Sequence, residues 1–144
     1  MSELTYQDDS QIRITVLAAH AVVRAGLRYM CNESKNLVMS GEAATTNDAI
    51  SLVRHKRTDV TVVDPDSSDI ALHAVAELHA AGVDRVLVLT GLTDLGAQKR
   101  AFELGAVGVV RKDQPEESGA ATAEEAGKQG QNDAQDLDGS KVSP

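Results

Sequence analysis

The sequence predicts an α/β domain built on a parallel sheet, and three observations lead to that fold class. Short apolar runs rich in valine alternate with segments whose apolar residues recur every three to four positions. The runs are typical of strands covered on both faces, and the intervening segments are typical of amphipathic helices. Short polar connections separate them. Five strands that alternate with four helices in this way imply right-handed βαβ units.

The five predicted strands are residues 12–17, 37–42, 60–63, 85–89 and 107–110. The third strand, Val-Thr-Val-Val, is predicted to be central because its residues all favour β structure and turn signals flank it. It ends at Asp64. Ligands bind outside the carboxyl ends of the strands in an open α/β sheet, so Asp64 is a candidate site residue. The alternative is a structural role, because an aspartate before proline commonly opens a turn.

The four predicted helices each combine an apolar stripe with a start or stop signal. Thr45 or Thr46 caps the second helix, and Gly82 and Gly105 end the third and the fourth. The fourth is predicted to start at Thr93 or Asp94. The stripes, in chain order, are Val23, Leu27, Met30 and Cys31; Ala49, Ile50 and Val53; Ala71, Ala74, Val75 and Leu78; and Leu95, Ala101 and Phe102.

Charge and composition divide the 144 residues into three parts. Residues 1–11 are polar and are expected to be flexible. Residues 12–113 form the predicted domain, which is close to neutral. Residues 113–144 hold 2 basic and 8 acidic side chains, so most of the net charge of −8 lies there. Residues 114–144 are therefore expected to be an acidic, disordered tail, because they carry too few large apolar side chains to form a core.

Several classes of function are excluded by composition. A near-neutral domain with an acidic tail has no basic stripe for nucleic acid. No apolar span is long enough for a membrane, and Cys31 is the only cysteine, so we expect a soluble, cytoplasmic protein. The four histidines lack zinc-ligand spacing, and neither a nucleophile elbow nor a phosphate loop occurs. The sequence therefore predicts a protein that is not an enzyme.

Over residues 12–112 the sequence resembles the receiver domains of bacterial response regulators, particularly those of the NarL/FixJ type. The segments that carry the resemblance are Val22–Arg28, Gly41–Ala44, Asp59–Asp64, Val88–Gly91, and Gly105–Gly108 followed by Lys112. The resemblance implies a flavodoxin-like (CheY-like) fold with strand order 2-1-3-4-5. The switch point of that order lies between the first and third strands, where ligands are expected to bind.

The resemblance also implies roles for individual residues. Asp64 matches the aspartate that accepts a phosphoryl group, and Thr90 and Lys112 match the groups that bind the phosphoryl oxygens. Ala18 and Ala19 stand where the family has two carboxylates, and alanine offers no side-chain oxygen to a metal. We therefore expect Mg²⁺ binding to be weak or absent, and no other cofactor.

Further departures from the family pattern concern shape and output. Val109 stands at the aromatic switch position, and Asp66 is interpreted as a turn residue rather than a metal ligand. The segment after Lys112 has no large apolar face, so the fifth helix is predicted to be weak or missing. The apolar face of the first helix is then expected to be covered by a partner or a second copy. The alternative is that Ala120 to Ala126 folds back as a short, poor helix, which the alanine content permits. No helix-turn-helix output domain is expected.

The interpretation favoured by the sequence is an atypical receiver module in signal transduction. It is expected to act by protein–protein interaction, without Mg²⁺-dependent phosphorylation. Two alternatives stay open. One is a working phosphoacceptor of a two-component system, modified at Asp64, and the other is a degenerate receiver that binds a small ligand in a pocket enlarged by the two alanines.

Overall fold

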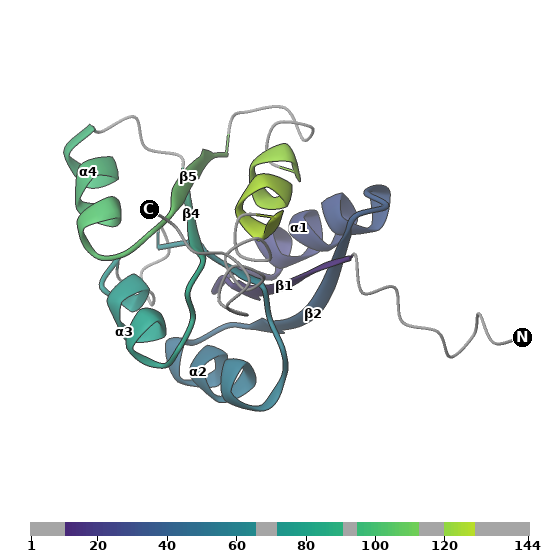
Figure 1. Ribbon diagram of the computed structural model, residues 1–144, viewed down its shortest axis with the longest axis horizontal. Helices are drawn as coiled ribbons and strands as arrows, with labels where there is room; N and C mark the ends of the chain where they lie inside the picture. The colour runs from purple at the N-terminus through teal and green to yellow at the C-terminus, as the bar shows by residue number, and fades with distance from the viewer. Residues whose placement is uncertain (1–10, 66–71, 91–94, 113–119, 129–144) are drawn as a thin grey trace, which may run out of the picture.

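A computed structural model describes residues 11–65, 72–90, 95–112 and 120–128. Five parallel strands form one sheet in the order β2-β1-β3-β4-β5, which confirms the predicted fold class and strand order (Figure 1). The strands are β1 Ile12–Leu17, β2 Leu37–Ala43, β3 Val60–Val63, β4 Val86–Thr90 and β5 Gly108–Arg111. The helices are α1 Ala21–Glu33, α2 Thr46–His55, α3 Ala74–Ala80 and α4 Leu95–Glu103, with a further helix at residues 120–128. Within these ranges, no helix is both long and apolar enough to cross a membrane.

Helices cover both faces of the sheet, as the continuous apolar strands require (Figure 1). Because side chains alternate along a strand, β3 supplies Val63 to one core and Val62 to the other. The core that contains Val63 lies under α2, α3 and α4. The core that contains Val62 lies under α1 and the 120–128 helix. All residues of β3 and β4 are buried, which makes these two strands the centre of the domain.

The predicted helix signals are present where the structure describes them. The Thr45 hydroxyl accepts a hydrogen bond from the Asp48 N–H at 3.2 Å and caps α2. Gly82 and Gly105 have φ of +105° and +117°, the left-handed conformation that favours glycine after a helix. Ala71, Thr93, Asp94 and Asp66 lie outside the described residues.

The predicted apolar stripe of α4 is wrong in two of its three residues. Ala101 is buried, but Leu95 and Phe102 are 77% and 51% exposed. The small Ala101 side chain faces the core, so the larger side chains of this helix lie on its solvent side. Two large apolar side chains are therefore displayed at the surface.

The fifth helix is present, although it is short and built from small residues. Residues 120–128 lie in the segment that the sequence assigned to the tail, and they form a helix beside α1 (Figure 1). Ala120, Ala123 and Ala126 pack against the core beneath α1. The predicted weakness of this helix is confirmed, but the expectation of a bare face is corrected, because the helix covers part of it.

Two contacts hold the 120–128 helix against the domain. A Cβ added to Gly127 would overlap the buried Ile12 side chain, so only glycine permits this close approach. The Glu124 carboxylate accepts hydrogen bonds from Ser34 Oγ at 3.1 Å and Asn36 Nδ2 at 3.4 Å. These partners lie 90 and 88 positions earlier in the chain, so periodicity within the helix gave no sign of them.

Candidate functional site

The three predicted phosphate-site residues come together at the carboxyl edge of the sheet. Asp64 directly follows β3, and its N–H donates to the Leu17 carbonyl at 2.9 Å. Thr90 is the last residue of β4. The Lys112 N–H donates to the Thr90 carbonyl at 2.8 Å, which fixes the end of β5 beside the end of β4. The parallel register therefore places one carboxylate, one hydroxyl and one ammonium at neighbouring strand ends.

The Asp64 carboxylate is buried and forms an ion pair. Its side chain is 1% exposed, and Lys112 Nζ lies 3.0 Å from Asp64 Oδ1. A buried charge is costly unless an opposite charge or hydrogen bonds compensate it. Lys112 supplies that compensation, while its own side chain stays 33% exposed. The pair joins the ends of β3 and β5 across the intervening strand.

Ala18 and Ala19 follow β1 and lie beside the Asp64 position. The register pairs Leu17 of β1 with Val63 of β3, so the residues after these two strands are neighbours. Ala18 is completely buried and its methyl group belongs to the core beneath α1. Neither alanine offers a side-chain oxygen. The structure therefore places both alanines next to the end of β3, where neither contributes a carboxylate.

The carbonyl groups of these alanines are engaged by a cationic side chain. Arg24 Nη1 donates to the Ala18 carbonyl at 2.8 Å and to the Ala19 carbonyl at 3.1 Å. Mg²⁺ needs about six oxygen ligands at close distance. The residues that the structure describes do not fit such an ion, because the Ala18 and Ala19 carbonyls face a guanidinium and the Asp64 carboxylate faces Lys112. Within the described ranges, no group of three His, Cys, Asp or Glu side chains could hold a metal.

The Arg24 side chain belongs to an ion-pair network that the sequence analysis did not identify. Arg24 Nε lies 3.2 Å from Glu42 Oε1, and Arg28 Nη2 lies 2.8 Å from Glu42 Oε2. Arg24 and Arg28 are four residues apart and therefore share one side of α1. This spacing was the available signal, together with a glutamate near the end of β2. The network ties α1 and β2 to the loop that contains the two alanines.

The predicted switch position has a different environment from the phosphate site. Val109 lies in β5, is half-buried, and packs against the core under α3 and α4. A valine is a short, β-branched side chain with a restricted χ1 angle. It cannot swing between two distant positions as a large aromatic ring can.

Comparison with curated proteins identifies several relatives, although no family model matches the chain. The uncharacterized transcriptional regulatory protein YxjL of Bacillus subtilis is 32% identical over 114 residues, which are 74% of this chain and 50% of that protein. The response regulator UvrY of Escherichia coli is 27% identical over 103 residues, or 70% of this chain and 47% of that protein. The chain thus spans about half the length of these relatives.

Comparison with solved structures identifies the fold. The receiver domain of the putative response regulator NarL from Mycobacterium tuberculosis has a TM-score of 0.75 at 21% identity, over 83% of this chain and 98% of that one. A LuxR-family response regulator from Aurantimonas has a TM-score of 0.76 at 24% identity, over 83% and 86%. The sequence matches and the shared 2-1-3-4-5 sheet agree: this chain is similar in sequence to response regulators and has the fold of their receiver domains.

Proposed function

We propose that this chain is an atypical receiver module that signals by binding another protein, without Mg²⁺-dependent phosphorylation of Asp64. The observation that carries the proposal is the pair of alanines beside Asp64, whose carbonyls accept hydrogen bonds from Arg24. This arrangement replaces acidic metal ligands with methyl groups and a guanidinium. The proposal also assigns no enzymatic activity to the chain.

The charge balance at the site supports this proposal. Phosphoryl transfer depends mainly on positioning and on neutralising the charge of the phosphoryl oxygens. An incoming phosphate would approach an Asp64 carboxylate that is buried and already paired with Lys112. One ammonium would then have to compensate both the carboxylate and the phosphate. Thr90 adds a hydroxyl but no charge, so the repulsion that a divalent cation relieves would persist.

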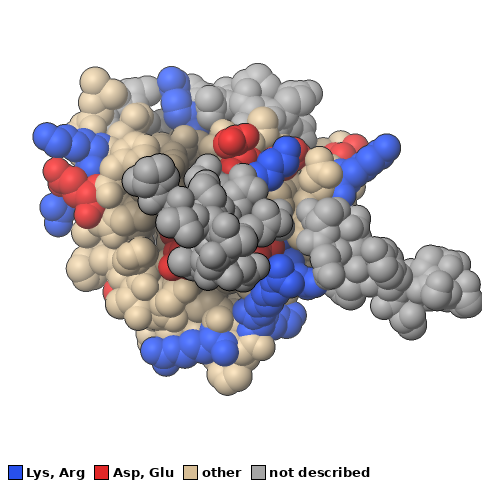
Figure 2. Space-filling model, viewed as in Figure 1, with Lys and Arg blue, Asp and Glu red and all other residues tan. Residues whose placement is uncertain are grey.

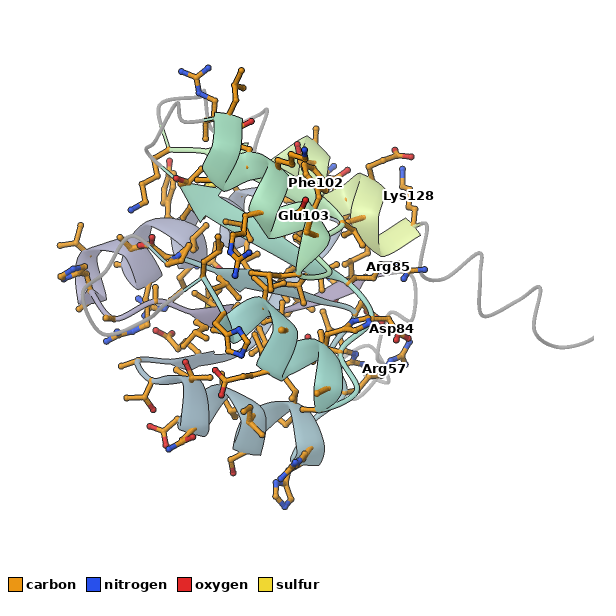
Figure 3. All side chains as sticks on the ribbon, turned by 90° about the vertical axis from the view of Figure 1, so that its left-hand side faces the viewer. Arg57, Asp84, Arg85, Phe102, Glu103 and Lys128 are labelled. Atoms are coloured by element: carbon orange, nitrogen blue, oxygen red, sulfur yellow. The ribbon has the colours of Figure 1, made fainter. Side chains whose placement is uncertain are left out.

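Exposed apolar side chains support a role in protein binding. Leu95 and Phe102 are seven residues apart in α4 and therefore lie on one side of that helix. Phe102 is labelled in Figure 3, on the ribbon of α4. Val107, just before β5, is a third exposed apolar residue at 44%. Large apolar side chains displayed on one side of a surface helix can mark a protein-interaction site.

The distribution of charge favours a protein partner over nucleic acid. On the face shown in Figure 2, the Lys and Arg side chains lie in several separate places among neutral and acidic residues. The net charge of the chain is −8. Nucleic-acid binding normally needs a continuous basic surface. We also place the module in the cytoplasm, a setting that suits the free thiol of Cys31.

Intact-mass analysis after incubation with acetyl phosphate and Mg²⁺ tests the phosphorylation part of the proposal. We expect no substantial phosphoryl adduct on the wild-type chain. Asp64→Asn is the matched control, because it removes the acceptor carboxylate. A large adduct on the wild type that is missing from Asp64→Asn would establish the working phosphoacceptor instead.

A pair of surface variants tests the protein-binding part. Leu95→Asp combined with Phe102→Asp changes only exposed positions of α4 and should keep the fold. The control is Val22→Asp, because Val22 is an exposed apolar residue of α1, at 83%. We expect a partner captured by the wild type and by the control to be lost from the α4 double variant. Capture that is unaffected by the α4 double variant would exclude this surface.

A further inference from the structure

An apolar cavity lies between α1, the 120–128 helix and the sheet. Its volume is about 450 Å³, and its walls include Leu27 and Met30 of α1, Val62 and Leu89 of the sheet, and Ala123. Figure 1 shows α1 and the 120–128 helix next to each other on this side of the sheet. The three α1 residues predicted to be buried here, Val23, Leu27 and Met30, are only half-buried. The 120–128 helix therefore covers the cavity without filling it.

The cavity is a consequence of how the 120–128 helix is seated. Gly127 already touches Ile12, so this end of the helix cannot move closer to the sheet. The hydrogen bond from Ser34 to Glu124 holds the same helix to the segment between α1 and β2. The residues that face the sheet from this position are alanines, whose single methyl groups do not span the gap. Ala120 and Ala123 thus form one wall of a space that larger side chains would occupy.

The size of the space indicates a ligand. Protein interiors are close-packed, and voids larger than a water molecule are few. An engineered apolar cavity of about 150 Å³ stays dry and binds benzene. The present cavity has about three times that volume and falls within the range of roughly 300–1,000 Å³ that is typical of small-molecule sites.

The charged residues of the wall indicate the kind of ligand. Among the described residues that line the cavity, the charged ones are Arg111 and Lys112, both cationic and both at the end of β5. Ligand sites commonly combine apolar walls with a few polar groups that orient the molecule. We propose that this cavity binds a single-chain amphiphile with an apolar body and one carboxylate, of the medium-chain fatty-acid class. The chain would lie among the α1 and sheet side chains, with the carboxylate toward Arg111 and Lys112.

Lys112 would connect this cavity to the phosphate-site aspartate. Its ammonium lies 3.0 Å from Asp64 Oδ1, and the same residue lines the cavity. A ligand carboxylate that attracts Lys112 competes with Asp64 for it. Because coupling between two groups is reciprocal, removing the Asp64 charge should tighten carboxylate binding. Ligand binding would therefore change the electrostatics around Asp64, at the carboxyl edge of the sheet, without any phosphoryl transfer.

Isothermal titration of the full chain with decanoate, below its micelle concentration, tests the proposal. Decanol and decyltrimethylammonium are the matched uncharged and cationic probes. We expect decanoate to bind at least about tenfold more tightly than the cationic probe, since a charge-assisted hydrogen bond contributes that much or more. Arg111→Gln should weaken decanoate binding and leave decanol binding unchanged. Asp64→Asn should tighten decanoate binding several-fold. An unchanged affinity would show that the ligand carboxylate does not lie near Lys112.

Two leucine variants of the same helix separate a filled cavity from a damaged fold. Ala123 is buried against the cavity, whereas Ala121 is exposed. Ala123→Leu should abolish binding of decanoate and decanol while the chain stays folded by circular dichroism. Ala121→Leu should bind both probes like the wild type.

Three further results would overturn the proposal. They are no binding of decanoate, equal binding of the cationic probe, and binding that Ala123→Leu leaves unchanged. A concentration-dependent dimer that Ala123→Leu disrupts, with no decanoate binding, would assign the cavity to a second copy of the chain. None of these results depends on whether acetyl phosphate modifies Asp64, so the two proposals can fail separately.

Discussion

Replacing Gly127 with alanine tests whether the 120–128 helix is seated on β1. The added Cβ would lie 2.8 Å from Ile12 Cδ1 and 2.9 Å from Ile12 Cγ1, well inside van der Waals contact. Ile12 is 1% exposed, so its side chain has little room to move. Overpacking of this kind costs about 1–3 kcal/mol. Alanine gains at most about 1 kcal/mol over glycine within a helix, and less in the last turn. We expect a net loss of stability of about 1–2 kcal/mol.

Gly26 of α1 provides the matched control for the same substitution. It lies in the middle of the helix, and a Cβ added there would meet no heavy atom within 4 Å. Gly26→Ala therefore keeps the full gain in helix propensity, about 0.5–1 kcal/mol. The two variants should change the stability of the chain in opposite directions.

Urea denaturation and thermal unfolding measure both effects. A change of 1 kcal/mol shifts the melting temperature of a domain of this size by roughly 4–8 °C. The contact between Gly127 and Ile12 would be refuted if Gly127→Ala stabilised the chain as Gly26→Ala does. A loss confined to Gly127→Ala would locate the helix over Ile12.

Two further variants test the carboxyl edge of the sheet beside Asp64 and the buried thiol of Cys31. Substituting aspartate at both Ala18 and Ala19 should create Mg²⁺ binding that calorimetry can measure. The same double variant should lower the stability of the metal-free chain by about 2 kcal/mol or more, because Ala18 is completely buried and the new charges repel Asp64. An intact fold that binds no Mg²⁺ would contradict this placement. Burial raises the pKa of Cys31 from 9.0 to about 11. Its contribution to stability, about 2 kcal/mol, is complete below pH 9 and is lost as the pH rises to 11. Denaturation at pH 8 and pH 11 should show this loss in the wild type and a smaller one in Cys31→Ala.

Much of the fold could be predicted because its signals are local. The strands at residues 12–17 and 60–63 were located to the residue. The first alternates and then becomes continuously apolar, and the second is an uninterrupted β-branched run typical of a buried parallel strand. Gly82 and Gly105 marked helix ends because a left-handed residue there is usually glycine. The family resemblance grouped Asp64, Thr90 and Lys112, and parallel strands do bring their carboxyl ends to one edge of the sheet.

The surface of α4 shows where periodicity misleads. Phe102 is a large apolar side chain in a predicted helix, and such residues are usually buried. The structure exposes it because Ala101, its neighbour in sequence, is the residue that faces the core. Which side of a short helix packs inward depends on the angle at which the helix meets the sheet, and the helix's own sequence only partly encodes that angle.

The sequence by itself determined the alternation of strands and helices, the 2-1-3-4-5 class of sheet through its family resemblance, and the identity of the residues at the receiver edge. The tertiary structure decided what those residues contact. Arg24 reaches the carbonyls of Ala18 and Ala19, and the 120–128 helix rests on Ile12 through a glycine. The composition of a segment limits how much apolar surface the segment can bury. The close approach of a helix to a strand depends instead on which small residues lie opposite that strand in the folded chain. That is why a helix of alanines could be read as a disordered tail, and why the cavity beneath it became visible only in three dimensions.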